Sequence, residues 1–215
     1  MNEVRSSADT EHREARQTRH DRKHRSSPNV AHRVCPPWVG TLLLCPLRRR
    51  AESPEAILGP HVQPGMTVLE PGCAKGYFTL PLARMVGPQG RVVCTEVQQK
   101  MLDRLHRRAR KAGLDDRIDA RLCTQDEQGL GDLRETIDFI AALHVVHEMF
   151  DQRAALAQMY DALRSGGRLL LLELPRHVSV ESFRGSLESA RLAGFRELPP
   201  PMTVRRGQLA LLEKA

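Results

Sequence analysis

The sequence lacks any apolar run long enough to cross a bilayer as a helix. A membrane-spanning helix needs about 20 consecutive apolar residues, and no such run occurs in the 215 residues. We therefore expect no membrane span. The longest apolar stretch near the N-terminus, residues 38–45, is too short and begins too far into the chain to be a signal peptide.

The chain also lacks a cysteine framework. Its five cysteines include no close pair, and an odd number without regular spacing is typical of free thiols rather than disulfides. Free thiols persist in reducing compartments. We therefore expect a cytoplasmic protein.

Residues 1–33 have almost no large apolar side chains. They are mainly Arg, His, Asp, Glu and Ser, so they bury too little apolar surface to offset the entropy of ordering. The composition predicts a disordered basic tail over 1–33 and one folded domain over 34–215. The net charge of +7 leaves nucleic acid open as a partner without favouring it.

Strand and helix patterns alternate from residue 67 onward. Apolar runs at 67–70, 91–97, 117–123, 137–143 and 168–174 are separated by amphipathic segments, which indicates a parallel sheet covered by helices on both faces. Two further short runs, 202–204 and 208–214, have no helix between them and predict an antiparallel hairpin at one edge. The expected fold is α/β, a doubly wound, mostly parallel seven-stranded sheet.

The amphipathic segments predict four main helices, at 76–86, 98–113, 151–167 and 180–194. The apolar face of the second is expected to consist of Met101, Leu105, Ala109 and Ala112. The apolar face of the third is expected to consist of Leu156, Met159, Tyr160 and Leu163.

A glycine turn, LEPGCAKG at residues 69–76, follows the first predicted strand. A nucleoside triphosphate loop needs Lys and then Ser or Thr after its last glycine, but here Lys75 precedes Gly76. A dinucleotide fingerprint needs glycines at its second place and Gly or Ala at its third. Those places hold Ala74 and Tyr77, and the tyrosine ring would block close packing of helix on strand. The turn therefore favours neither ligand.

The same turn resembles the first motif of class I S-adenosylmethionine-dependent methyltransferases, acid-x-G-x-G-x-G, with Ala74 at the middle glycine. The alanine is compatible with close approach of the cofactor if its φ is negative. The resemblance runs from about residue 35 to 214. It covers bacterial and archaeal enzymes of the broad group that includes quinone-biosynthesis C-methyltransferases. The stretches that carry it are GYFTLPLA, RVVCTEVQQKML, DFIAALHVVHEM, LRSGGRLLLLELPRHVS and ARLAGF.

The resemblance implies a Rossmann-like class I methyltransferase domain over 34–215, with S-adenosyl-L-methionine as cofactor. Glu96, at the end of the second predicted strand, is expected to accept both ribose hydroxyls. Glu70 is expected to orient the loop and the methionine ammonium. The adenine amino group is expected at Asp126, with Glu127 and Thr124 as rivals. The other expected cofactor contacts are Gly72, Cys73, Ala74, Gly76, Val97, Leu143 and His144.

The segment ALHVVHEM, residues 142–149, follows the fourth predicted strand. Its order H-x-x-H-E matches neither zinc-protease pattern, and we expect no metal. His147 is the candidate general base because imidazole titrates near neutrality. His147 and Glu148 could face the substrate or cap the following helix. Glu173 and His177, at the end of the fifth strand, are further pocket candidates.

The leading hypothesis is in-line methyl transfer to a small molecule. A nucleic-acid or protein methyltransferase is the rival enzyme. The chain has neither an Asp/Asn-Pro-Pro-aromatic motif nor a nucleophilic cysteine after the fourth strand, as amino-adenine and cytosine methylases respectively would. A non-catalytic cofactor-binding protein on the same fold is the alternative from a different class.

Overall fold

The computed structural model describes residues 52–199 and 207–215. These residues contain one seven-stranded sheet with the strand order β3-β2-β1-β4-β5-β7-β6. The strands are β1 (Thr67–Pro71), β2 (Arg91–Glu96), β3 (Ile118–Leu122), β4 (Ile137–Leu143), β5 (Leu163–Glu173), β6 (Arg196–Leu198) and β7 (Gln208–Glu213). The predicted tail at 1–33 and the predicted strand at 202–204 lie outside the described residues.

Five neighbouring strands of the sheet are parallel. β1 pairs with β2 on one side and with β4 on the other, so the direction of winding reverses between β1 and β4. β7 is antiparallel to both β5 and β6. The predicted doubly wound, mostly parallel sheet with antiparallel C-terminal strands is confirmed. Ligands of such sheets bind outside the carboxyl ends of the strands, at the reversal point.

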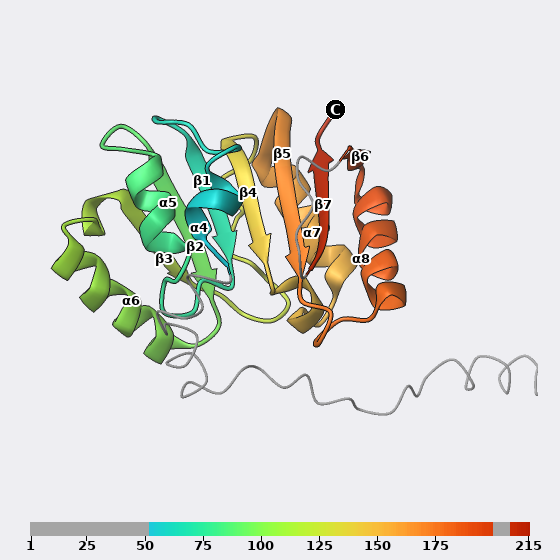
Figure 1. Ribbon diagram of the computed structural model, residues 1–215, viewed down its shortest axis with the longest axis horizontal. Coiled ribbons are helices and arrows are strands. Elements are labelled where there is room, and N and C mark those ends of the chain that lie inside the picture. The colour runs from blue at the N-terminus through green and yellow to red at the C-terminus, as the bar shows by residue number, and fades with distance from the viewer. Residues whose placement is uncertain (1–51, 200–206) are drawn as a thin grey trace, which may run out of the picture. The chain divides into compact units, whose positions relative to one another are not determined.

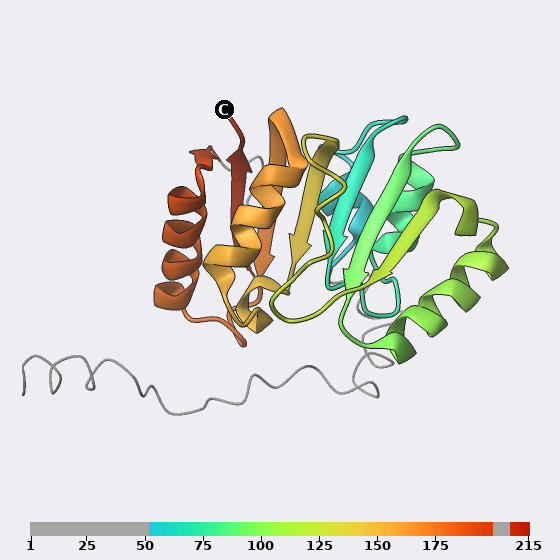
Figure 2. The same cartoon turned by 180° about the vertical axis from the view of Figure 1, so that it is seen from behind.

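Helices cover both faces of the sheet (Figures 1 and 2). They are α4 (Pro54–Leu58), α5 (Thr79–Met85), α6 (Gln99–Ala112), α7 (Gln152–Ala162) and α8 (Val180–Ala193), with short 3-10 turns η2 (Asp115–Arg117) and η3 (Val146–Glu148). Apolar side chains of α4, α5 and α6 form one core with the sheet. Those of α7 and α8 form a second core on the opposite face.

Local polar groups define where the helices begin and end. Ser53, Asp151 and Ser179 each accept a backbone N–H in the first turn of α4, α7 and α8, which satisfies a donor that the helix itself leaves open. Gly113 and Gly194 end α6 and α8 in the left-handed conformation, as glycine does at such ends. At these five boundaries the sequence therefore agrees with the geometry.

Two details of the helix predictions were wrong. Helix α7 ends at Ala162, and Leu163 begins β5 opposite Ile137. Leu163 is fully buried, so it continues an apolar pattern that cannot distinguish the last helical turn from a buried strand. On α6, Ala112 was expected on the buried face but is exposed, and Leu102, which was not expected there, is buried beside Met101.

Within the described segments, no helix combines the length and hydropathy that a bilayer-spanning helix needs. Cys73, Cys94 and Cys123 carry free thiols. Cys73 and Cys94 are buried.

Candidate functional site

A cavity of about 220 Å³ lies at the carboxyl ends of the parallel strands. Glu96 and Leu143 stand at the last positions of β2 and β4, Glu70 stands at the last position but one of β1, and all three line the cavity. In Figure 1 the arrowheads of β4 and β5 point to this edge of the sheet. The loops add Gly72, Cys73, Ala74, Tyr77, Phe78, Val97, Gln98, Thr124, Gln125, His144, Val145, Glu148, Met149, Phe150, Leu174 and His177, among others. The cavity therefore occupies the position where such folds bind ligands.

The two glycines of the turn after β1 have different roles. Gly72 lines the cavity with φ +67°, and a Cβ there would lie 2.3 Å from Val145 Cγ2. Gly76, at φ +78°, does not line the cavity. A Cβ there would lie 2.4 Å from Leu105 Cδ1 on α6. The structure thus brings Gly72 to the cavity, whereas Gly76 permits the loop to pack on α6.

Ala74 has φ +47°, and the expected negative φ was wrong. A non-glycine residue in the left-handed region costs about 1–2 kcal/mol. The Ala74 N–H donates to Glu96 Oε2 at 3.0 Å, and this bond helps to hold the strained backbone. The tight turn between Gly72 and Gly76 sets the dihedral angle, and its sequence motif did not reveal that.

Glu96 is 7% exposed and joins the turn to the cavity. Oε2 accepts from Ala74 N, and Oε1 accepts from Gln98 N at 2.9 Å. Burial raises the pKa of Glu96, and these backbone donors oppose the rise. A carboxylate has about four acceptor positions. Each oxygen of Glu96 therefore retains capacity for one more donor, as two adjacent ribose hydroxyls require.

Glu70 is 3% exposed, and its buried Oε2 has no hydrogen-bond partner in the part of the chain that the structure describes. Burial raises the pKa of Glu70 to about 8; the nearby Thr79 side chain opposes this rise and the charge of Glu96 adds to it. A buried carboxyl with an open oxygen on a cavity wall is expensive without a ligand. A cation that binds in the cavity would satisfy it.

Cys73 lines the cavity but is poorly suited to nucleophilic chemistry. Its thiol lies beside that of Cys94, and this contact, together with burial, raises the pKa of Cys73 well above its ordinary value. Because the thiolate is the reactive form, Cys73 is unreactive at neutral pH.

The loop after β3 differs from the prediction. Asp126 is exposed and does not line the cavity, because a turn closed by two hydrogen bonds between Thr124 and Glu127 directs it to solvent. Thr124, Gln125 and Gln128 line the cavity instead. The two glutamines had been overlooked; the polar run CTQDEQ after the third strand marked the right loop but not which side chains turn inward.

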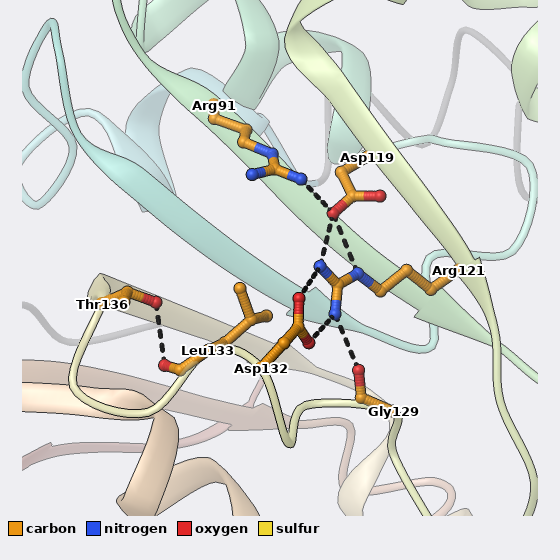
Figure 3. A network of polar contacts seen from close by, with 7 residues as sticks. All are labelled: Arg91, Asp119, Arg121, Gly129, Asp132, Leu133 and Thr136. Atoms are coloured by element: carbon orange, nitrogen blue, oxygen red, sulfur yellow. Dashed lines mark hydrogen bonds and ion pairs between the residues drawn. The ribbon is translucent and has the colours of Figure 1, made fainter.

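Arg121 of β3 anchors this loop (Figure 3). Its guanidinium makes two bonds to Asp132, at 2.6 and 2.9 Å, and one to the Gly129 carbonyl at 2.9 Å. It also bonds Asp119 on its own strand at 2.9 Å. Paired N–H···O bonds of this kind fix geometry as well as adding energy. The network therefore holds the segment that carries Gln125 and Gln128.

On the other side of the cavity, His144 follows Leu143 with φ +59°. Its Nε2 pairs with the carboxylate of Glu52, and the Tyr77 hydroxyl donates to the Glu52 carbonyl at 2.7 Å. Its buried Nδ1 has no hydrogen-bond partner among the described residues. Leu143 and Val97 also reach the cavity, as expected for them.

His147 and Glu148 form a polar chain with Glu173. The Glu173 carboxylate, 1% exposed, accepts the His147 backbone N–H at 3.2 Å and lies 2.8 Å from His147 Nδ1. The other ring nitrogen of His147, Nε2, lies 3.9 Å from Glu148 Oε1. Glu148 lines the cavity whereas His147 does not, and the ring of His177, which does, lies 5.9 Å from that of His147. Glu148 is thus the member of the chain that a ligand would meet.

Burial and neighbouring charges shift the pKa values of His147 and Glu148. The bond from Glu173 raises the pKa of His147. Burial raises the pKa of Glu148, which the charge of His147 opposes. Among residues 52–199 and 207–215 no group of three or more His, Cys, Asp or Glu side chains is placed to hold a metal ion.

These residues fit S-adenosylmethionine as a ligand. Glu70 offers a buried, unpaired carboxyl oxygen for an ammonium, and Glu96 offers open acceptor positions for a pair of hydroxyls. The backbone at Gly72 and Ala74 lies on the cavity wall.

The comparisons with known proteins agree with this arrangement. Residues 68–167 match a family model described as "Methyltransferase domain". The chain is 31% identical over 117 residues to the ubiquinone/menaquinone biosynthesis C-methyltransferase UbiE of Enterobacter sp. (strain 638). That match covers 54% of this chain and 46% of the relative, so the chain spans about half the length of the curated relatives it matches.

Solved structures show the same fold. A SAM-dependent methyltransferase from Aquifex aeolicus superposes with a TM-score of 0.76 at 22% identity, over 85% of this chain and 100% of that one. A [4+2]-cyclase, SpnF, superposes with a TM-score of 0.60 at 22% identity, over 68% of this chain and 58% of that one. The fold is therefore compatible with more than one named activity. The matched segment, the fold and the position of the cavity all agree with the class I S-adenosylmethionine-dependent methyltransferase family.

Proposed function

We propose that the protein transfers a methyl group from S-adenosyl-L-methionine to a small molecule. The observation that carries this proposal is the pair of buried acids on one cavity wall. Glu70 has an unpaired oxygen that suits the methionine ammonium, and Glu96 has open acceptor positions that suit the ribose. The family of the domain supports the same ligand.

The remaining cofactor contacts are assigned by position on the cavity wall. Gly72, Cys73 and Ala74 approach the methionine part with their backbone, and Leu143 and His144 flank the cofactor on the β4 side. Val97, with its neighbour Gln98, lies against the adenine. Thr124 and Gln125 replace Asp126 as the partners of the adenine edge, because they line the cavity and it does not.

The bound cofactor supplies a methyl group on a sulfonium sulfur, which is a good leaving group. The protein's task is to place the acceptor in line and to exclude water, effects worth roughly 7–11 kcal/mol in favourable cases. Met149, Phe150 and Leu174 provide an apolar wall next to Glu148. An apolar wall with one acid suits a small organic acceptor better than a nucleic-acid backbone, whose phosphates an acid repels.

Glu148 is proposed as the group that takes a proton from the acceptor, with His147 behind it. The sequence had suggested His147 as the base. Because Glu148 lines the cavity and His147 does not, Glu148 contacts the acceptor, and His147 is a positioning residue that Glu173 orients. The free thiols of the described residues support a reducing compartment, and we place the protein in the cytoplasm.

The experiment that tests the proposal is label transfer from deuteromethyl S-adenosylmethionine. Purified protein is incubated separately with the small-molecule ultrafiltrate and with the nucleic-acid and protein fractions of a bacterial extract, and label is followed by mass spectrometry. The expected result is label in the ultrafiltrate only. Label in a macromolecular fraction alone would replace the small molecule with a nucleic acid or protein. No transfer in any fraction from protein that binds the cofactor would favour the non-catalytic alternative.

A further inference from the structure

The wall of the cavity is acidic. Three carboxyl groups line it, from Glu70, Glu96 and Glu148, and that of Glu173 lies directly behind, on His147. Among the described residues that line the cavity, none is Lys or Arg. An anionic ligand entering this space would meet acidic side chains and no described lysine or arginine with which to pair, which is unfavourable.

Two of the three lining acids are accounted for by the cofactor proposed above. Glu148 is the third, and it stands on η3, directly after β4, with about a third of its side chain exposed. His177, Met149 and Phe150 line the cavity with it. This part of the wall therefore combines one carboxylate, one imidazole and an apolar surface. Because the cofactor does not use it, it is available to bind the methyl acceptor.

The charge changes during methyl transfer distinguish the possible acceptors. An amine is neutral when it attacks and becomes positive as the sulfonium loses its charge, so positive charge is retained throughout the step. An amine is therefore compatible with an acidic wall, since it arrives as an ammonium and its product leaves as one. A phenolate, enolate or other anionic nucleophile would instead be disfavoured by the same carboxylates before it reacts.

We infer that the methyl acceptor is a small primary or secondary amine with an apolar body, bound as an ammonium by Glu148; the inference rests on the proposed function. The ammonium gives one proton to the Glu148–His147 pair. The nitrogen lone pair then forms the N–C bond to the methyl carbon while the C–S bond breaks, and its electron pair goes to sulfur. The products are a methylated ammonium and S-adenosylhomocysteine, and the proton on the pair passes to solvent.

His147 and its surroundings suit this step. Its Nε2 faces Glu148 at 3.9 Å, its Nδ1 faces Glu173, and His177 lies edge-on to its ring. Burial raises the pKa of Glu148; the charge of His147 opposes this rise, and the charges of Glu96 and Glu173 add to it. Glu148 is therefore a stronger base than an exposed carboxylate, as a group that must deprotonate an ammonium requires.

The test is to identify the atom that receives the label. Products formed in the ultrafiltrate from deuteromethyl S-adenosylmethionine are separated on a cation exchanger, and the labelled atom is located by fragmentation and NMR. Deuteromethyl groups on amine nitrogen are expected. Label on carbon or oxygen, label on an anionic product, or no label on any amine would each overturn the inference, and the first two would leave the proposed function standing.

A matched pair of variants ties the result to Glu148. Glu148→Gln should lower the rate of amine methylation about 100-fold, while the affinity for S-adenosylhomocysteine, measured by calorimetry, changes less than about threefold. Glu197→Gln, an exposed glutamate on the edge strand β6, should change neither. An unchanged rate in a folded Glu148→Gln protein would remove Glu148 from the acceptor site. A loss of cofactor affinity in Glu148→Gln would place this residue in the cofactor half instead, and would also overturn the inference.

Discussion

The two halves of the cavity use their acids differently. On the side of β1 and β2, Glu70 Oε2 has no hydrogen-bond partner among the described residues, and Glu96, which accepts from backbone N–H groups, keeps open acceptor positions. On the side of β4 and β5, Glu173 and Glu148 face His147 from opposite sides. Unused hydrogen-bond acceptor positions suit the binding of a polar ligand, whereas a row of neighbouring titratable groups suits the movement of a proton. The contrast predicts that changes in the first half alter affinity and changes in the second half alter rate.

The largest expected effect is in the second half. Glu173→Gln removes the carboxylate that holds His147 Nδ1 and should lower turnover about 100-fold. It should also lower the pKa of His147, since the bond to Glu173 is the main cause of its elevation. The pH profile of turnover and the NMR titration of His147 would show both effects. Cofactor affinity should remain unchanged, and a variant with reduced affinity but normal turnover would contradict the division into halves.

Glu96→Ala is the corresponding change in the first half. It removes the expected ribose acceptor and two anchors of the turn, from Ala74 and Gln98. Cofactor binding should weaken by about 1–3 kcal/mol, the scale of a charge-assisted hydrogen bond. Calorimetry with S-adenosylhomocysteine measures the change. Unchanged affinity in a folded Glu96→Ala protein would exclude Glu96 from the cofactor site.

Arg121→Gln tests the loop after β3, and its expected effect on cofactor affinity is smaller. Loss of the paired bonds to Asp132 and of the bond to Gly129 should loosen Gln125 and Gln128. We expect weaker cofactor binding by about 1 kcal/mol, with normal turnover at saturating cofactor. Arg134→Gln, in the same loop but not among the hydrogen-bond partners of Arg121, is the control. An equal effect of both variants would show that the network has no particular role.

Ala74→Gly should have the smallest effect. With φ at +47°, glycine relieves strain, and the gain is offset in part by the greater entropy of the unfolded chain. The free energy of unfolding should rise by up to about 1 kcal/mol, and cofactor affinity should stay within about tenfold of the wild type. A marked loss of stability on chemical denaturation would mean that the left-handed backbone carries no strain.

The sequence predicted most of the first half because its residues are close together in the chain. Glu70, Gly72 and Ala74 belong to one turn, and Glu96 ends the next strand, so strand order alone brings them together. The backbone of Ala74 could not be predicted, since a motif gives residue types but not dihedral angles. The role of Gly76 could not be predicted either, because its closeness to Leu105 depends on how α6 packs.

The second half was less predictable because its contacts join distant residues. Glu173 meets His147 across 26 positions of sequence, and this depends on the register that pairs Leu143 with Leu172 at the ends of β4 and β5. The sequence placed both residues at one rim but did not reveal that they bond, or that Glu148 rather than His147 faces the cavity. Asp126 was expected at the cavity for a different reason, because the local turn between Thr124 and Glu127 that directs it outward was not recognised in the sequence.

The central claim, that Glu70 and Glu96 hold S-adenosylmethionine, is tested most directly by the protons that binding releases. The pKa of Glu70 is raised to about 8, so the free protein keeps this proton between pH 4.5 and 8 while the unfolded chain loses it. The stability of the free protein therefore falls as pH rises through that range. An ammonium bound beside Glu70 would lower the pKa of this carboxyl group, so that it loses its proton when the cofactor binds.

Calorimetric titration of the cofactor at pH 6.5, in buffers of different ionisation enthalpy, counts those protons. We expect binding with a Kd of roughly 1 µM–1 mM and release of about one proton, lost in the Glu70→Gln variant. Binding without proton release, or no binding at millimolar cofactor, would contradict the account.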